Sequence, residues 1–298
     1  MAIIQVDNLT MTYRSGKGIF DISFNVAEGE CFGYLGPNGA GKTTTIRQLM
    51  GFTNADQGKC LIKGIDTRDR SEEIQKHIGY LPDELSFFSG MTGKKFLDFM
   101  YDMRKLHDRS LMEKLIADFE LDIKTKIDNM SKGMKRKLGI ITAFMHDPDI
   151  YILDEPTSGL DPLMQKKLIN LILDEKERNK TIFMSSHRFD EIELTADTAG
   201  IIKEGRLVTV QDIESLRASR QKIFNVTVSQ EEDIEKFKDS NLRLGYIKDR
   251  QVEVIISDDI NEFTELLARC KIENLDIRRQ NLEQVFMKYY GREGGSDE

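Results

Sequence analysis

Cysteine, tryptophan and proline are scarce in this sequence, and long apolar runs are missing from it. Of its 298 residues three are cysteines, five are prolines and none is a tryptophan. Cys31, Cys60 and Cys270 are odd in number and far apart, which favours free thiols in a reducing cytosol over disulfides or a zinc site. No apolar run approaches the roughly 20 residues of a membrane helix, and no apolar signal segment follows Met1. These absences predict a globular protein that is not itself inserted in a membrane.

An excess of positive charge is also missing. The net charge is −8, from 43 basic and 51 acidic residues, which argues against a nucleic-acid partner. With 39% hydrophobic and 32% charged residues, the chain has enough apolar side chains for a core. Its length suggests two domains. We expect a first domain over residues 1–214 and a small accessory domain over residues 219–298.

A glycine-rich loop organises the first domain. Residues 36–43 match the phosphate-binding pattern G-x-x-x-x-G-K-[ST]. They are Gly36, Pro37, Asn38, Gly39, Ala40, Gly41, Lys42 and Thr43. Glycines without a Cβ let the backbone curl around an anion, and its N–H groups then make a nest for phosphate oxygens. Lys42 can reach the β- and γ-phosphates, and Thr43 can offer its hydroxyl to Mg²⁺.

The surroundings of this loop suit the phosphate interpretation. A short buried strand is predicted over residues 31–35, and a helix over 42–50 would end at Gly51 and turn its N-terminus to the phosphates. The alternative is a glycine-rich turn that binds nothing. A single phosphate loop, without internal repeats, predicts one nucleotide-binding unit per chain.

Strands are predicted on both sides of Tyr13, over residues 2–12 and 19–26, in an antiparallel arrangement. A further short strand is predicted over residues 58–62. Two interpretations of Tyr13 carry about equal weight. It is either a strand-end aromatic or a ring that stacks on an adenine.

Polar residues follow three more predicted strands. One strand leads into Asp83 and Glu84, one over 150–155 ends in Asp154 and Glu155, and one over 181–186 precedes His187. Two acids at the end of a buried strand are costly unless they have partners. Asp154 can orient Mg²⁺ and Glu155 can polarise an attacking water. Asp83 and Glu84 are either solvated or within reach of a metal, and His187 is either structural or placed at the sheet edge where ligands bind.

Helices are predicted between these strands. A helix over residues 92–106 places Phe96, Leu97, Met100 and Met103 on one face, and a second amphipathic helix covers 110–120. The Phe and Met residues favour the core of a small subdomain, with a docking groove for a partner as the minority interpretation.

Two helix starts carry a capping residue. Ser131 caps an apolar helix and makes its start a candidate anion site. The basic run 135–137 in that helix is interpreted mostly as a solvated face. Asp161 caps another helix, with Pro162 at its first position.

After residue 220 the predicted order is strand, helix, two strands, helix, strand. This βαββαβ order resembles a ferredoxin-like sandwich, and it contains no recognisable chemical motif. A last helix is predicted over 282–290, and the tail 294–298 is predicted to be disordered.

The order of the motifs is more specific than any one of them. The phosphate loop, Ser-Lys-Gly-Met at 131–134, Leu-Asp-Glu-Pro at 153–156, Ser-Gly-Leu-Asp at 158–161 and Ser-Ser-His at 185–187 follow one another. Over residues 1–214 the chain closely resembles the nucleotide-binding subunit of an ATP-binding cassette (ABC) transporter. Strand 78–81 leading into acids, the lysine at 132 and Leu-Glu-Gln-Val-Phe at 282–286 resemble the drug-, antibiotic- and sodium-efflux exporters. The resemblance implies an α/β P-loop NTPase core with an antiparallel β subdomain and a helical subdomain at about 84–146.

The resemblance also implies a nucleotide and metal site. Tyr13 would stack on the adenine of ATP, and residues 38–44, including Thr44, would wrap its phosphates. Thr43 would bind Mg²⁺, and Asp154 would support the ion. Asp83 stands where the family often has a glutamine that senses Mg²⁺ and the membrane partner, and its carboxylate can still bind that ion.

Catalysis and pairing follow from the same resemblance. Glu155 would be the general base and His187 would contact the γ-phosphate. Ser131 and Gly133 would bind the γ-phosphate of ATP held by a second copy, in a head-to-tail dimer with two ATP molecules, and Asp161 would signal between the copies. Lys132 departs from the usual glycine of this signature and adds a positive charge there.

Together these features predict an ATPase subunit at the inner face of the cell membrane. It would drive export through a separate integral membrane permease, with no nucleic acid involved. Two rivals stay open at this point: a soluble ATPase of the same fold that acts on nucleic acid or the ribosome, and a regulator that binds ATP without hydrolysing it. The former usually carries two cassettes or a long coiled-coil insertion, which this chain lacks.

Overall fold

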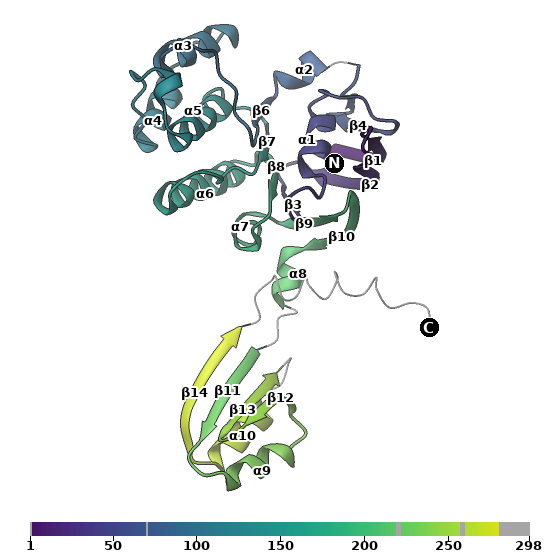
Figure 1. Ribbon diagram of the computed structural model, residues 1–298, viewed down its shortest axis with the longest axis vertical. Helices are drawn as coiled ribbons and strands as arrows, with labels where there is room; N and C mark the ends of the chain where they lie inside the picture. Colours follow the sequence, from purple (N-terminus) through teal and green to yellow (C-terminus); the bar gives the residue numbers. More distant parts are fainter. Residues whose placement is uncertain (1, 70, 219–221, 257–259, 280–298) are drawn as a thin grey trace. The chain divides into compact units, whose positions relative to one another are not determined.

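The computed structural model describes residues 2–69, 71–218, 222–256 and 260–279 (Figure 1). Contacts divide the chain into two compact units, Met1–Ile213 and Glu214–Glu298. Within the described residues, every helix is too short or too polar to cross a bilayer.

A six-stranded sheet forms the centre of the first unit. Its strand order is β10 (Arg206–Asp212), β9 (Thr198–Lys203), β3 (Cys31–Leu35), β8 (Thr181–Ser186), β7 (Ile150–Asp154) and β6 (Ile78–Leu81). All neighbours are parallel except β9 and β10, which form a hairpin. Every residue of β3, β7 and β8 is buried, because helices cover both faces of a parallel sheet. The strands predicted over 31–35 and 181–186 are confirmed, and the one predicted over 150–155 ends at Asp154.

Helices lie on both sides of this sheet (Figure 1). Helix α1 (Lys42–Leu49) lies on one side, and α6 (Pro162–Glu177) and α7 (Phe189–Thr195) lie on the other. The short helix α2 (Ser71–Gln75) precedes β6, and α8 (Ile213–Ala218) follows β10.

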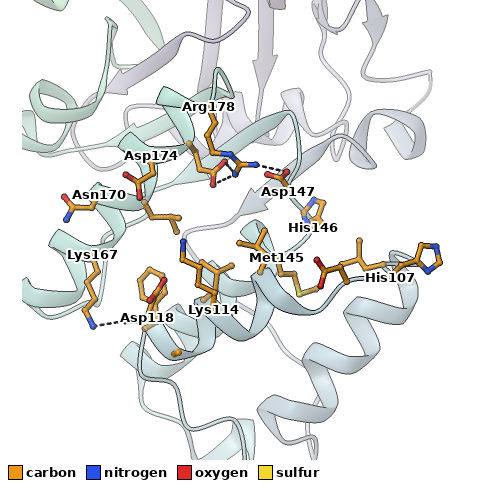
Figure 2. Close-up of a pocket in the computed structure, with 18 residues that line it drawn as sticks. His107, Lys114, Asp118, Met145, His146, Asp147, Lys167, Asn170, Asp174 and Arg178 are labelled. Atoms are coloured by element: carbon orange, nitrogen blue, oxygen red, sulfur yellow. Dashed lines mark hydrogen bonds and ion pairs between the residues drawn. The ribbon is translucent and has the colours of Figure 1, made fainter.

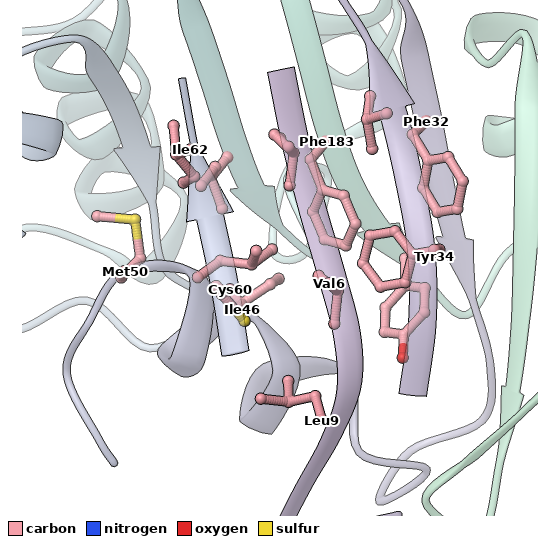
Figure 3. Close-up of a cluster of buried hydrophobic side chains, with 14 of the residues drawn as sticks. Val6, Leu9, Phe32, Tyr34, Ile46, Met50, Cys60, Ile62 and Phe183 are labelled. Atoms are coloured by element: carbon pink, nitrogen blue, oxygen red, sulfur yellow. The ribbon is translucent and has the colours of Figure 1, made fainter. Parts of the chain in front are cut away.

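An antiparallel sheet packs against the α1 side of the parallel one. Its order is β2 (Gly18–Ala27), β1 (Ala2–Thr12), β4 (Gln57–Ile62) and β5 (Ile65–Asp66); β5 was not predicted. Phe24 of β2 stacks on Phe32 and Phe183 of the parallel sheet, at centroid distances of 5.0 and 5.6 Å, inside the buried cluster of Figure 3. This packing fixes the end of β1, and so Tyr13, beside the glycine-rich loop.

Three helices and a 3-10 turn form the helical segment between β6 and β7. They are α3 (Gly93–Met103), α4 (Ser110–Asp118), η1 (Ile127–Asn129) and α5 (Lys132–Phe144). The predicted buried face of α3 is wrong at Met103, which is 61% exposed. The helix ends at this residue, and Tyr101 is the buried side chain of its last turn.

The second unit has the predicted βαββαβ order. Its elements are β11 (Lys222–Val228), α9 (Glu232–Lys238), β12 (Arg243–Lys248), β13 (Gln251–Ile256), α10 (Asn261–Ala268) and β14 (Ile272–Arg279). The sheet order is β12-β13-β11-β14, with antiparallel neighbours. Its core includes Phe224, Phe237 and Phe263. The ferredoxin-like assignment stays a prediction, and the helix predicted over 282–290 and the tail 294–298 lie outside the described residues.

Candidate nucleotide site

The glycine-rich loop joins the carboxyl end of β3 to the start of α1. Gly39 and Gly41 have φ angles of 79° and 113°, the left-handed region that glycine enters without a steric penalty. A Cβ on Gly36 would lie 2.4 Å from the carbonyl oxygen of Ile202, so the loop can pass close to β9 only with glycine there. Ala40 is buried, and its N–H donates to the carbonyl of Pro37 across 3.2 Å. The loop is a tight backbone turn at the N-terminus of a helix, which is the geometry that binds anions.

Lys42 turns its side chain back over this loop. Its Nζ donates to the carbonyl oxygens of Gly36 at 2.6 Å and Pro37 at 3.2 Å, and it lies 3.0 Å from Oε1 of Glu155. The side chain is only 6% exposed. A buried ammonium next to main-chain N–H groups provides strong attraction for phosphate oxygens.

Asp154 ends β7 and is fully buried. Its Oδ1 accepts a 2.5 Å hydrogen bond from Ser185 Oγ on the neighbouring strand, whereas Oδ2 has no hydrogen-bond partner among the described residues. Burial raises the pKa of Asp154, and the Ser185 hydrogen bond and the nearby Thr43 hydroxyl oppose that shift. An unpaired buried carboxylate oxygen beside a threonine hydroxyl fits a hard divalent cation such as Mg²⁺.

Glu155 follows with a left-handed backbone, φ 46°. Its Oε2 lies 2.7 Å from Nδ1 of His187, which comes directly after β8. Its Oε1 lies 3.0 Å from Lys42 Nζ without hydrogen-bond geometry. Left-handed backbone is strained for a residue other than glycine and is found at functional sites. Glu155 thus lies between a cation and an imidazole at the mouth of the loop.

One pocket of about 420 Å³ unites most of the predicted site. The predicted residues that line it are Tyr13, Asn38, Gly39, Gly41, Lys42, Thr43, Thr44, Asp83 and Glu155. Tyr13 is 37% exposed, and its hydroxyl lies 3.4 Å from Thr44 Oγ1. The ring is therefore available for contact with a ligand at the pocket rim.

Eight predicted residues do not line this pocket. Gly36, Pro37 and Ala40 belong to the loop itself, Asp154 lies directly before Glu155, and His187 contacts Glu155. The other three are Ser131, Gly133 and Asp161. They lie at the starts of α5 and α6, where Ser131 Oγ accepts from the N–H of Met134 at 3.2 Å and Asp161 Oδ1 accepts from that of Met164 at 3.0 Å. Both predicted N-caps are confirmed. A Cβ on Gly133 would lie 3.2 Å from the carbonyl oxygen of Gly159, so the start of α5 lies against the turn that precedes α6. They form a second surface that this chain's own loop does not reach.

Arg136 is the residue that the sequence interpretation missed. The run 135–137 was predicted to be mostly solvated, which is wrong for Arg136, because it is 2% exposed. Its guanidinium donates to carbonyl oxygens of the segments that follow β6 and β7. Its sequence neighbours gave no signal, since the partners are about 20 and 50 residues away in the chain.

Glu191 of α7 is a second missed residue. It is buried and accepts hydrogen bonds from Thr157 Oγ1 at 2.5 Å and Ser186 Oγ at 2.8 Å. It thus ties the segment after Glu155 to the segment before His187. In the sequence, Glu191 was recognisable only as an acidic residue in a short amphipathic stretch.

A larger cavity of about 1010 Å³ lies between α4, the end of α5 and α6 (Figure 2). None of the predicted nucleotide or metal residues lines it. His146, Lys114 and Asp174 line it, and Arg178 in its wall is bound to Asp147 and Glu175. The nucleotide chemistry therefore belongs to the smaller pocket.

Comparisons with known proteins agree with this geometry. The family described as "ABC transporter" matches residues 19–158. The bacitracin transport ATP-binding protein BcrA of Bacillus licheniformis is 37% identical over 230 residues, covering 76% of this chain and 75% of that protein. The linearmycin resistance ATP-binding protein LnrL of Bacillus subtilis is 30% identical, covering 97% and 99%.

A solved structure described as the ATP-binding subunit of an ABC transporter is 28% identical. It has a TM-score of 0.66 over 72% of this chain and 92% of its own length. The predicted core, an α/β nucleotide-binding fold with antiparallel and helical subdomains, is confirmed. The chain belongs to the ATP-binding proteins of ABC transporters, and it is an ATPase.

Proposed function

We propose that this chain is the ATP-hydrolysing subunit of an exporter whose permease is a separate membrane protein. The observation that carries the proposal is the position of Glu155, between Lys42 and His187 at the mouth of the phosphate loop. The names of the relatives BcrA and LnrL, which refer to bacitracin transport and linearmycin resistance, support an export role.

In this proposal the pocket holds one ATP. Tyr13 contacts the adenine, and the loop N–H groups and Lys42 hold the phosphates. Thr43 and Asp154, with Asp83 at the pocket edge, would hold Mg²⁺, which would neutralise charge on the phosphates. Once phosphate oxygens take over the pairing with Lys42, Glu155 is released to orient a water for in-line attack, and His187 holds the other carboxylate oxygen.

We also propose a head-to-tail homodimer with two ATP molecules at its seam. The phosphate loop and the Ser131–Gly133 surface occur once per chain and do not meet within it. A second copy would bring its Ser131 hydroxyl and helix start to the phosphates, and Asp161 lies beside that surface to relay the contact.

The permease is proposed to dock on an apolar patch that we define as Phe88, Phe99 and Met103. These side chains are 55%, 40% and 61% exposed, and the Phe88 and Phe99 rings meet edge to face with centroids 5.8 Å apart. Contiguous exposed apolar groups mark interaction sites. The patch lies in the segment that follows Asp83, so one continuous stretch of chain joins the proposed docking surface to the nucleotide pocket.

The test compares Glu155→Gln with Asp174→Asn, an acid of the Figure 2 cavity. Glu155→Gln is expected to bind ATP but to lose hydrolysis by about 100-fold or more, because it cannot accept a proton from water. It is also expected to accumulate as an ATP-bound dimer in light scattering, whereas Asp174→Asn should behave like the wild type. Hydrolysis by Glu155→Gln at the wild-type rate would refute the base assignment. Turnover stimulated by RNA, with no membrane partner co-purified, would refute the exporter.

A further inference from the structure

Arg136 is a buried cation bonded to main-chain oxygens. Its Nε donates to the carbonyl of Pro156 at 3.0 Å, and its Nη1 donates to those of Pro82 at 2.6 Å and Asp83 at 3.0 Å. Its Nη2 donates to the carbonyl of Asp154 at 2.8 Å and to that of Glu155. The flat guanidinium, with donors in fixed directions, is suited to such a set of acceptors.

These bonds join three segments that the proposed mechanism uses. One follows β6 and carries Asp83, one follows β7 and carries Glu155, and the third is the start of α5, where Ser131 lies five residues before Arg136. Any shift of the α5 start must therefore move the carbonyls of Asp83 and Glu155, or break bonds to a buried charge.

Electrostatics point the same way. Burial lowers the pKa of Arg136, and the negative charges of Asp83, Asp154 and Glu155 oppose this shift by favouring the cationic form. Among the described residues Arg136 forms no ion pair with a carboxylate. Arg136 therefore places a positive charge near three acids while its hydrogen bonds go to their main-chain oxygens. The three carboxylates stay available for other partners.

Arg104 provides a comparison within the same fold. It also donates to carbonyls, those of Gln75 and Ile78, each at 3.4 Å. These lie at the opposite end of β6 from Asp83, so Arg104 braces the helical segment without touching the catalytic loops.

We propose that Arg136 is a positioning residue that keeps Glu155 and Asp83 in register with the Ser131 surface. When Ser131 contacts a nucleotide bound to the partner copy, the same event would then fix the positions of Glu155, the base, and of Asp83 at the pocket edge. The inference rests on the proposed function, since it assumes Glu155 as base and Ser131 as the contact across the seam.

The first experiment compares Arg136→Lys with Arg104→Lys in the full chain. Lysine keeps the charge but cannot reach the same five acceptors. Arg136→Lys is expected to lower kcat about 10- to 100-fold, the effect of misplacing a catalytic group by about 1 Å. Binding of a fluorescent ATP analogue should stay within about twofold of wild type, because the phosphate loop is untouched. Arg104→Lys should lower Tm but keep kcat.

The second experiment places Arg136→Lys in the Glu155→Gln background. ATP-driven dimerisation, followed by light scattering, is expected to need several-fold more ATP than in Glu155→Gln alone. This readout does not depend on hydrolysis, and a purely structural role would not change it in a folded protein.

The outcomes separate the two claims. A wild-type kcat in Arg136→Lys would overturn the inference and leave the proposed function standing. The same holds if kcat falls in proportion to the loss of Tm in both Arg136→Lys and Arg104→Lys. Loss of ATP-analogue binding in Arg136→Lys would also overturn it, because the residue would then act through the phosphate loop. Wild-type hydrolysis by Glu155→Gln would overturn both claims.

Discussion

Nδ1 of His187 lies 2.7 Å from Oε2 of Glu155, although the two residues follow different strands. The contact exists because β7 and β8 are parallel neighbours, with Asp154 opposite Ser185, so that the residues that follow them emerge at the same sheet edge. Glu155 then turns back through its left-handed backbone. The carboxylate orientation is set by the histidine and by Lys42 before any substrate arrives.

Replacing His187 with Ala should lower turnover more than it lowers ATP binding. Without the imidazole, Oε2 of Glu155 loses its partner, and we expect kcat to fall about 10- to 100-fold. Steady-state kinetics combined with equilibrium binding of an ATP analogue measure the two effects. A fall in affinity as large as the fall in kcat would show that His187 serves binding and not orientation.

The double variant Phe88→Ser, Phe99→Ser should lose the membrane partner but keep the basal ATPase. Both rings are exposed and lie outside the nucleotide pocket, so their removal takes away docking area and little stability. Co-purification with the permease, and the change of ATPase rate on its addition, test this. Leu194→Ser is the control, because Leu194 is 56% exposed on α7; equal loss of the partner in this control would contradict the patch.

Gly79→Ala should destabilise the first unit. A Cβ there would lie 2.3 Å from the carbonyl oxygen of Ala143 and 2.8 Å from the ring of Tyr151. The helix α5 would have to move off β6, and we expect a loss of about 1–3 kcal/mol in the free energy of unfolding, measured with urea.

The matched control for Gly79 is Gly64→Ala. Gly64 has open space around it but a φ of 76°, so only backbone strain of roughly 1–2 kcal/mol applies. The ATPase of Gly64→Ala should stay at the wild-type rate. Gly79→Ala should also lower turnover if the packing of β6 on α5 positions Asp83 and Arg136. Stability equal to wild type in Gly79→Ala would contradict the packing described here.

His146 should make stability depend on pH. Its Nε2 lies 3.1 Å from the Ile78 carbonyl, so Nε2 carries the proton, and Nδ1 is buried without a hydrogen-bond partner among the described residues (Figure 2). Burial, aided by the charge of Arg104, lowers the pKa of His146 from 6.5 to about 4. Between these values the unfolded chain binds the proton and the folded chain does not. Stability from this group is therefore complete above pH 6.5 and falls as the pH drops to 4, by at most about 3 kcal/mol.

His146→Gln isolates this contribution, since its amide nitrogen can still donate to Ile78. The difference in unfolding free energy between wild type and variant should shift in favour of the variant as the pH falls from 6.5 to 4. His107→Gln, at an exposed histidine of the same cavity, should leave the slope unchanged. Parallel pH curves for wild type and His146→Gln would contradict the lowered pKa.

Much of the site could be predicted from the sequence because its elements are local. The strand 31–35, the glycine loop and the helix start at Lys42 form one continuous stretch, and the acids and histidine each follow an apolar strand. The resemblance to ABC subunits implied that Asp83, Glu155 and the loop share one site, and parallel strands that end at one sheet edge are the physical reason. The structure brings them into one pocket.

What could not be predicted depends on segments that meet only after folding. Arg136 stands between two lysines, and its burial arises from two turns that converge on it from far along the chain. Met103 continues the apolar spacing of α3, but the helix stops there, and periodicity does not state where packing ends. Glu191 likewise has partners from the ends of two strands.

The hydrogen bonds of Arg136 do not depend on which amino acids supply the acceptors. All five acceptors are peptide oxygens, which every amino acid supplies, so the side chain at position 83 can be exchanged without removing a bond. The backbone path of the segment at position 83 therefore does not depend on the side chain that it carries. Such an arrangement lets a sequence vary its metal-facing group, an acid here, while the scaffold beneath keeps its shape.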